Sequence, residues 1–140
     1  MSELTLNVSR IINAPIESVF NAWLDPEMLA QFMTPGEGVT VPRADADPRV
    51  GGNFNIIMLA GDNEMPHSGE YLAIDPHSLL IFTWQSGRSV DGSTVSLNFT
   101  EVDGGTNVAL TQVKFLDESA RSDHEGGWTA ILASLGRVLN

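Results

Sequence analysis

The stretch from Trp128 to the end of the chain constrains the fold more than any other part of the sequence. Apolar residues recur there at the i, i+3, i+4, i+7 spacing of one helical stripe: Trp128, Ile131, Leu132, Leu135, Val138 and Leu139. Burying one such side chain stabilises a protein by roughly 1.5–3 kcal/mol, so another element must cover this stripe. Gly126 and Gly127, which precede it, are poor helix formers. They indicate that the helix begins or kinks there, or that its backbone approaches another element closely.

Upstream of this helix the chain has the pattern of strands and turns, apart from two short helices. Alternation of apolar and polar residues predicts strands at 4–12, from 39 onward, at 54–58, 67–74, 79–84, 94–100 and 106–115. Short amphipathic helices are expected at 16–23 and 29–33, with Asp25 placed to cap the second. Strands joined by short turns form an antiparallel sheet, which must curve strongly to wrap one long helix. We therefore expect an α+β fold, with a curved antiparallel sheet of about seven strands around the C-terminal helix, in one domain over residues 1–140.

Two polar residues interrupt the faces that the strand pattern turns inward. Arg10 shares its face with Leu6, so we expect it at the open end of its strand or, by preference, in an ion pair with a buried acid. In the last strand Val108 and Leu110 share a face with Gln112, whereas the apolar residues after it lie on the other face. Either a β-bulge or an inward-pointing polar group would explain this break.

Charge and composition exclude several classes of function. The formal net charge is −11, and Lys114 is the only lysine, so the surface repels nucleic-acid phosphates and anionic lipid. We expect no nucleic-acid or membrane partner, since no apolar run is long enough to span a bilayer. The absence of cysteine fits a cytoplasmic protein. The three histidines lack metal-ligand spacing, so neither a metal nor another cofactor is expected.

Nine short segments, in order along nearly the whole chain, resemble one family. They are INAP at 12–15, VFNAW at 19–23, DPE at 25–27, RVGG at 49–52, GEY at 69–71, IDP at 74–76, LIFTW at 80–84, GT at 105–106 and GW at 127–128. Together they resemble the activator of Hsp90 ATPase homologue 1-like (AHSA1) family of the START/Bet v 1-like (SRPBCC) superfamily. The chain departs from the family pattern at His77, where a second proline is usual, and at Phe32, where a tryptophan is frequent.

The resemblance implies a helix-grip fold, in which a seven-stranded antiparallel sheet grips the C-terminal helix around a cavity. Members commonly bind hydrophobic small molecules in that cavity, and relatives include polyketide cyclases, lipid carriers and plant hormone receptors. The resemblance therefore implies binding of a small hydrophobic or aromatic molecule between the sheet and the helix.

Strand parity and the helix stripe select residues that would line such a cavity or fill it as core. The apolar candidates are Trp23, Phe32, Phe54, Met58, Phe82, Trp84, Leu97, Phe99, Trp128 and Leu132. The polar candidates, which would orient a ligand, are His67, Tyr71, Gln112 and His124. If the helix extends across Gly126 and Gly127, His124 lies on the face of Trp128, near the cavity mouth. Each histidine could instead be a hydrogen-bonded structural residue, which we favour most for His77.

Two other functions stay open at this point. The HExxH, CxxC, GxSxG, P-loop and GxGxxG motifs are all missing from the sequence. An enzyme of cyclase or hydrolase type would need a general acid–base residue in the cavity, for which His67, Tyr71 and His124 are the choices. A partnership with an Hsp90-type chaperone is suggested only by the family's name, and we do not expect it. The sequence does not indicate the oligomeric state.

Overall fold

A computed structural model describes residues 4–36, 38–86 and 92–139. Its elements follow the predicted order, with two short helices after the first strand and a long helix at the end. They are β1 (Thr5–Ile12), α1 (Ile16–Ala22), α2 (Pro26–Phe32), β2 (Val39–Ala46), β3 (Asn53–Ala60), β4 (Asn63–Asp75), β5 (Leu79–Thr83), β6 (Thr94–Val102), β7 (Gly105–Val113) and α3 (Glu118–Leu139). The predicted α+β helix-grip fold is confirmed.

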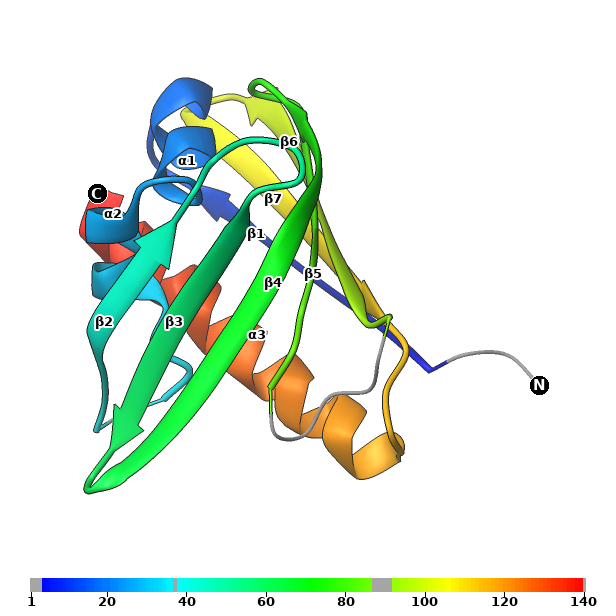
Figure 1. The fold of residues 1–140 in the computed structure, drawn as a ribbon. Coiled ribbons are helices and arrows are strands. Elements are labelled where there is room, and N and C mark those ends of the chain that lie inside the picture. The colour runs from blue at the N-terminus through cyan, green and yellow to red at the C-terminus, as the bar shows by residue number, and fades with distance from the viewer. Residues whose placement is uncertain (1–3, 37, 87–91, 140) are drawn as a thin grey trace.

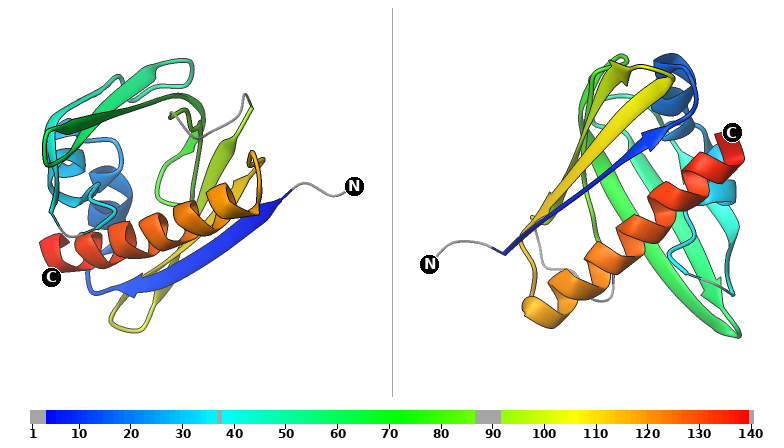
Figure 2. Two further views of the ribbon diagram at one scale, coloured as in Figure 1. Left: turned by 90° about the horizontal axis from the view of Figure 1, so that it is seen from below. Right: turned by 180° about the vertical axis from the view of Figure 1, so that it is seen from behind.

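One seven-stranded antiparallel sheet has the order β1-β7-β6-β5-β4-β3-β2. It curls into a half-barrel, and α3 lies across the open side, as Figures 1 and 2 show. The long helix packs against β1 at one edge of the sheet and against α2 near the other edge. Because a sheet this curved leaves an inner trough, the amphipathic stripe of α3 becomes the cover of that trough.

The long helix starts at Glu118, ten residues before the start at Trp128 that the apolar stripe predicted. The Asp117 side chain accepts a hydrogen bond from the backbone N–H of Ala120 at 2.8 Å, and Arg121 pairs with Glu118 and Glu125. Such capping and i, i+3/i+4 pairs stabilise the first turns of a helix. These contacts, together with the packing of the helix, outweigh the low helix propensity of the two glycines that follow.

The two polar residues on inward faces have different outcomes. The predicted ion pair of Arg10 is wrong: its side chain is exposed, lies beside Gly136 of α3, and forms no ion pair with the residues that the structure describes. Gln112 points inward and is fully buried, while β7 keeps a regular register with both of its neighbours. The parity break therefore marks an inward polar group, not a bulge.

The core fills the trough between the sheet and the three helices. At the end where α1 covers β6, the rings of Phe20 and Phe99 pack edge-on with centroids 5.2 Å apart.

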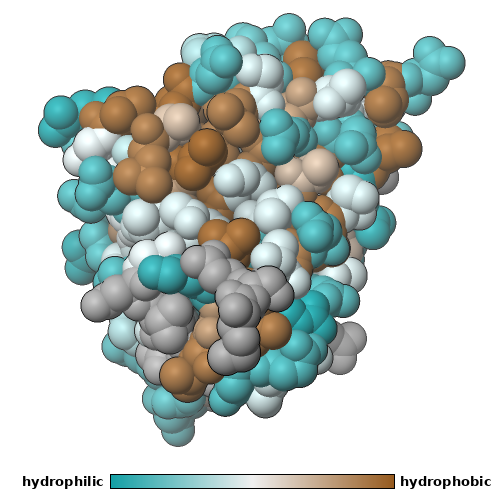
Figure 3. Space-filling view, turned by 90° about the vertical axis from the view of Figure 1, so that its right-hand side faces the viewer, coloured by the Kyte–Doolittle hydropathy of each residue, from teal (hydrophilic) through white to brown (hydrophobic). Residues whose placement is uncertain are grey.

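Asp25 caps α2 as predicted, accepting a hydrogen bond from the backbone N–H of Glu27 at 3.0 Å. On the face of the molecule shown in Figure 3, hydrophobic side chains lie among hydrophilic ones. Within the described part of the chain, no helix is long and apolar enough to cross a membrane.

Candidate functional site

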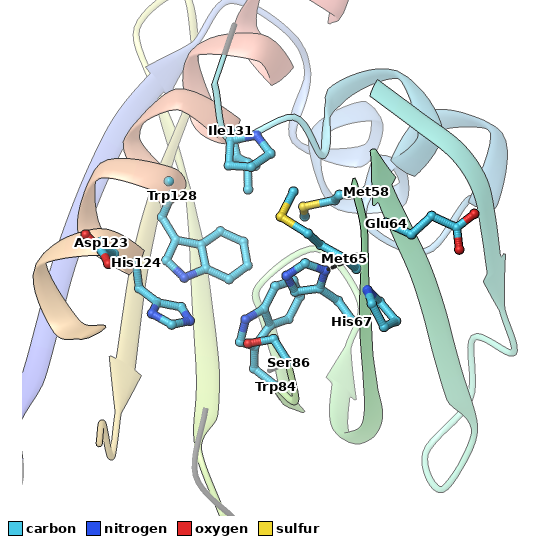
Figure 4. A pocket seen from close by; sticks show the side chains of 13 residues that line it. Met58, Glu64, Met65, His67, Trp84, Ser86, Asp123, His124, Trp128 and Ile131 are labelled. Carbon is cyan, nitrogen blue, oxygen red and sulfur yellow. Dashed lines mark hydrogen bonds between the residues drawn. The ribbon is translucent and has the colours of Figure 1, made fainter. Parts of the chain in front are cut away.

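A cavity of about 400 Å³ lies between the first half of α3 and the β3–β4 hairpin (Figure 4). Its size falls in the range of pockets that enclose small molecules. Side chains from α3, β3, β4, the segment after β5 and the loop after α2 form its wall. The lining residues are Pro35, Met58, Glu64, Met65, Pro66, His67, Trp84, Ser86, Asp123, His124, Gly127, Trp128 and Ile131.

The inner wall of this cavity is aromatic and sulfur-containing. Met58 and Met65 face each other as partners in the β3–β4 ladder. The rings of Trp84 and Trp128 lie 4.8 Å apart between centroids, and both side chains are at most 3% exposed. Flexible thioethers beside large flat rings form a surface that adapts to apolar ligands of different shape.

A buried hydrogen-bond chain fixes Trp128. Its indole Nε1–H donates to Gln112 Oε1 at 2.7 Å, Gln112 Nε2–H donates to Ser93 Oγ at 2.9 Å, and the Ser93 hydroxyl donates to the Val113 carbonyl at 3.0 Å. Gln112 is 0% exposed, so it acts from the core behind the cavity wall. The predicted polar residue of the last strand thus orients the wall but does not line the cavity.

Trp84 lacks a comparable partner. It directly follows β5, where a backbone hydrogen bond from the Trp84 N–H to the Ser93 carbonyl and an isolated bridge between Gln85 and Ser68 hold the chain. Its ring packs on His67 with centroids 5.1 Å apart. Its indole Nε1 is buried and has no hydrogen-bond partner among the residues that the structure describes. An unpaired buried donor is rare, because it costs about 1–3 kcal/mol.

The two histidines of the cavity have the same hydrogen-bond arrangement. His67 Nδ1 lies 2.9 Å from the Met65 carbonyl oxygen, and His124 Nδ1 lies 2.7 Å from the Ala120 carbonyl oxygen. A carbonyl only accepts, so each Nδ1 carries the proton, and in the neutral ring Nε2 is then an acceptor. Burial lowers the pKa of His67, and repulsion from His124 lowers it further, although the bond to Met65 opposes both effects.

The structure brings five of the fourteen predicted site residues to this cavity: Met58, His67, Trp84, His124 and Trp128. A second group lies around a separate internal void of only about 10 Å³, which Trp84 also borders: Trp23, Phe54, Tyr71 and Phe82. The rest are buried in the core and line neither space: Phe32, Leu97, Phe99, Gln112 and Leu132.

Sequence reasoning missed most of the cavity rim. Met65 and Glu64 were not predicted as cavity residues because the predicted strand began at residue 67, whereas β4 begins at Asn63. Asp123 and Gly127 escaped because the helix was predicted to begin at Trp128. Correct boundaries for these two elements would have placed these four residues beside His67 and His124.

The two glycines of α3 have different surroundings. A Cβ on Gly127 would lie 3.4 Å from the Pro35 Cβ, whereas a Cβ on Gly126 would meet no atom within 4 Å. The predicted close approach therefore exists only at Gly127. The element approached is the loop after α2, which carries Pro35.

A second hollow of about 430 Å³ lies between the start of α1 and the β6–β7 turn. Glu17 and Glu101 contribute to its wall, which has no aromatic residue. Within the described part of the chain, no group of three or more His, Cys, Asp or Glu residues is arranged to hold a metal ion. The cavity beside α3 is therefore the better candidate site for a small organic molecule.

Comparisons with known proteins bear on the family. The family model described as "Activator of Hsp90 ATPase homolog 1-like protein" matches residues 13–140. Among solved structures, an AHSA1-like protein from Aeromonas hydrophila is 25% identical, with a TM-score of 0.83 over 96% of this chain and 90% of that chain. An AHSA1 protein from Silicibacter pomeroyi is also 25% identical, with a TM-score of 0.81 over 97% of each chain. A protein from Rhizobium leguminosarum is 27% identical, with a TM-score of 0.82 over 99% of this chain and 95% of that chain. The comparison with curated proteins gives no match.

Proposed function

We propose that this chain, which belongs to the activator of Hsp90 ATPase homolog 1-like family, binds a small apolar or aromatic molecule in the cavity between α3 and the β3–β4 hairpin. START/Bet v 1-like proteins often bind hydrophobic ligands, which supports the proposal. The observation that carries it is the wall in which Trp84 and Trp128 stand beside Met58 and Met65. Such a wall offers apolar area to a flat ligand, at about 25 cal/mol for each Å² that binding removes from water.

A titration followed by ¹H–¹⁵N correlation spectra tests the proposal, with naphthalene and 2-methoxynaphthalene as neutral aromatic probes. We expect the indole N–H signals of Trp84 and Trp128 to shift in a saturable way, because both rings line the cavity. Saturating probe should also raise the melting temperature, because a ligand that binds only the folded state stabilises it. If neither probe shifts these signals or the melting temperature, the proposal fails.

A matched pair of variants locates the binding site. Met65→Trp adds an indole on β4 at the cavity wall, whereas Leu72→Trp adds the same group on β4 at a residue that is 44% exposed and lies outside the cavity. We expect Met65→Trp to weaken probe binding at least tenfold and Leu72→Trp to leave it unchanged. Equal binding by both variants would place the probe elsewhere.

Acid–base catalysis of cyclase or hydrolase type is the second candidate, favoured by His67 and His124 lining the same cavity. Tyr71 is not available for it, since its side chain is 1% exposed and borders the small internal void. Turnover of aryl ester probes that His67→Phe abolishes, with probe binding retained, would support catalysis. Binding without any turnover would remove this candidate.

A further inference from the structure

Half of the sheet has an outer face without a charged side chain. In β1, β7, β6 and β5 every second residue points away from the core, and we call this set the outer face. Along these strands the set begins at Thr5, Gly105, Thr94 and Leu79, respectively. The structure describes all four strands, in which Arg10 and Glu101 are the only charged residues. Both belong to the inward set, since Arg10 pairs with Val108 and Glu101 pairs with Thr106.

An unbroken register joins these residues into one continuous surface. Asn7 pairs with Thr111, Thr111 with Ser96, and Ser96 with Ile81, so their side chains form a row across the four strands. Along this row the Thr111 hydroxyl donates a hydrogen bond to Asn7 Oδ1 at 2.8 Å. Figure 3 views the side of the molecule on which β5 and β6 lie in Figure 1, and pale atoms of intermediate hydropathy occupy much of its middle.

The absence of charge is local to this half of the sheet. Solvated sheet faces carry charged side chains, and edge strands in particular use them to prevent pairing with other chains. The outward positions of the other half follow this rule, with Arg43 and Asp45 on β2 and Glu70 on β4. β1 is an edge strand and does not follow it. Composition does not explain the difference, because 18% of the chain is charged.

The charge of the whole chain indicates which partner fits this surface. A basic partner would be drawn to carboxylates, and the outer face has none. Two copies of this chain, each with a formal net charge of −11, repel each other least where neither presents a charge. Hydroxyl and carboxamide groups both donate and accept hydrogen bonds, so a face rich in threonine, serine and asparagine can pair with itself. A two-fold dimer requires this self-complementarity, because it brings the same surface of both copies together.

The outer face also holds exposed apolar side chains and has a useful size. Ile11 is 56% exposed and Val102 is 36% exposed, and they lie on either side of β7, opposite Asn107 and Gly105. Four strands about 4.8 Å apart and about 25 Å long cover roughly 500 Å² per copy, or roughly 1,000 Å² in a dimer. That total is near the lower limit of specific interfaces, so a dimer formed through this face is expected to be weak.

We propose that the outer face of β1, β7, β6 and β5 is an interface between two copies of this chain. The copies meet face to face about a two-fold axis, and each shields Ile11 and Val102 from water. The cavity beside α3 stays open, since it lies on the inner side of the sheet. The proposal is therefore independent of ligand binding, and either can fail without the other.

The unaltered protein gives the first test. Sedimentation velocity from about 5 μM to about 1 mM should show a dimer that grows with concentration. Over the same range, backbone amide signals of β1, β7 and β6 should shift in ¹H–¹⁵N correlation spectra, whereas those of β2 and β3 should not. A monomer at every concentration, or shifts confined to β2 and β3, would overturn the proposal.

Salt distinguishes this interface from one held by opposite charges. Raising sodium chloride from about 0.05 M to about 0.5 M should strengthen the dimer, because salt screens the repulsion between two acidic copies. A dimer that salt weakens would be held by ion pairs, and the uncharged outer face would not be its interface.

A matched pair of variants locates the interface. Thr100 on β6 belongs to the outer face, and Thr40 lies on β2 at the opposite edge of the sheet; both are exposed. Thr100→Glu and Thr40→Glu add the same charge, so their effects on net repulsion are equal. We expect Thr100→Glu to weaken the dimer at least tenfold, because it places like charges in the contact, and Thr40→Glu to change it by less than about twofold. Equal weakening by both variants, with unchanged melting temperatures, would place the interface elsewhere.

Discussion

Gln112 is the residue whose replacement tests the construction of the site most sharply. Its side chain accepts from Trp128 Nε1–H at 2.7 Å and donates to Ser93 at 2.9 Å, with no exposure to solvent. Gln112→Leu keeps about the same volume but leaves the Trp128 donor unpaired in the core. An unsatisfied buried donor costs about 1–3 kcal/mol. We therefore expect the free energy of unfolding to fall by about 2 kcal/mol.

Chemical denaturation and calorimetry measure this loss. For a domain of this size a loss of about 2 kcal/mol lowers the melting temperature by roughly 6–10 °C. The Trp128 indole ring also loses its anchor, so its N–H signal should move and the binding of naphthalene should weaken. Loss of the hydrogen bond between Trp128 and Gln112 thus lowers both stability and naphthalene affinity, because the Trp128 ring is part of the cavity wall.

A double-mutant cycle separates the bond from the loss of the glutamine itself. In a Trp128→Phe background the indole donor is absent, so Gln112→Leu should cost less than about 1 kcal/mol. The remaining loss would come from Ser93, which keeps its own bond to the Val113 carbonyl. If Gln112→Leu costs the same in both backgrounds, or costs nothing in the natural one, the hydrogen bond from Trp128 to Gln112 does not position the indole ring.

Three further predictions follow from single contacts and pKa shifts. Gly127→Val should lower the melting temperature and weaken probe binding, because its Cβ would meet the Pro35 Cβ at 3.4 Å on the cavity wall. Gly126→Ala is the control: its Cβ would meet no atom within 4 Å, so it should stabilise the helix by about 1 kcal/mol. An unchanged melting temperature and probe affinity for Gly127→Val would contradict the contact with Pro35. Burial raises the pKa of Tyr71, the only tyrosine, from 10.0 to about 12 in the folded protein. The free energy of unfolding should therefore fall as pH rises from 10 toward 12. Ultraviolet absorbance measures the titration of the phenol, and a midpoint near pH 10 would contradict the prediction. The pKa of His67 in the folded protein lies below its usual 6.5, so the free energy of unfolding should fall as pH drops below 6.5. In melting curves recorded at several pH values, His67→Phe should reduce this dependence of stability on pH. An equal pH dependence in both proteins would refute the lowered pKa of His67.

The fold could be predicted because alternation and helical spacing both express which side of an element is buried. The inward glutamine could be located in the same way, since Gln112 follows Val108 and Leu110 in parity. The start of α3 could not, because its first ten residues carry little apolar periodicity. The helix cap at Asp117 and the ion pairs of Arg121 with Glu118 and Glu125 determine where α3 begins. Helix propensity does not predict such side-chain contacts.

The alternation of side chains along a strand could not distinguish residues of the cavity wall from residues of the core. It predicts which face of the sheet a side chain lies on, but not where along the trough that side chain lies. Phe99 and Trp84 both point inward, yet Phe20 of α1 packs on Phe99 and fills that end of the half-barrel. At the other end Trp84 meets α3, where Gly127 presents no side chain. The cavity therefore forms where the covering helix is locally small and the short helices do not reach. That arrangement depends on how three helices share one trough, which is a property of their packing and not of any one stretch of sequence.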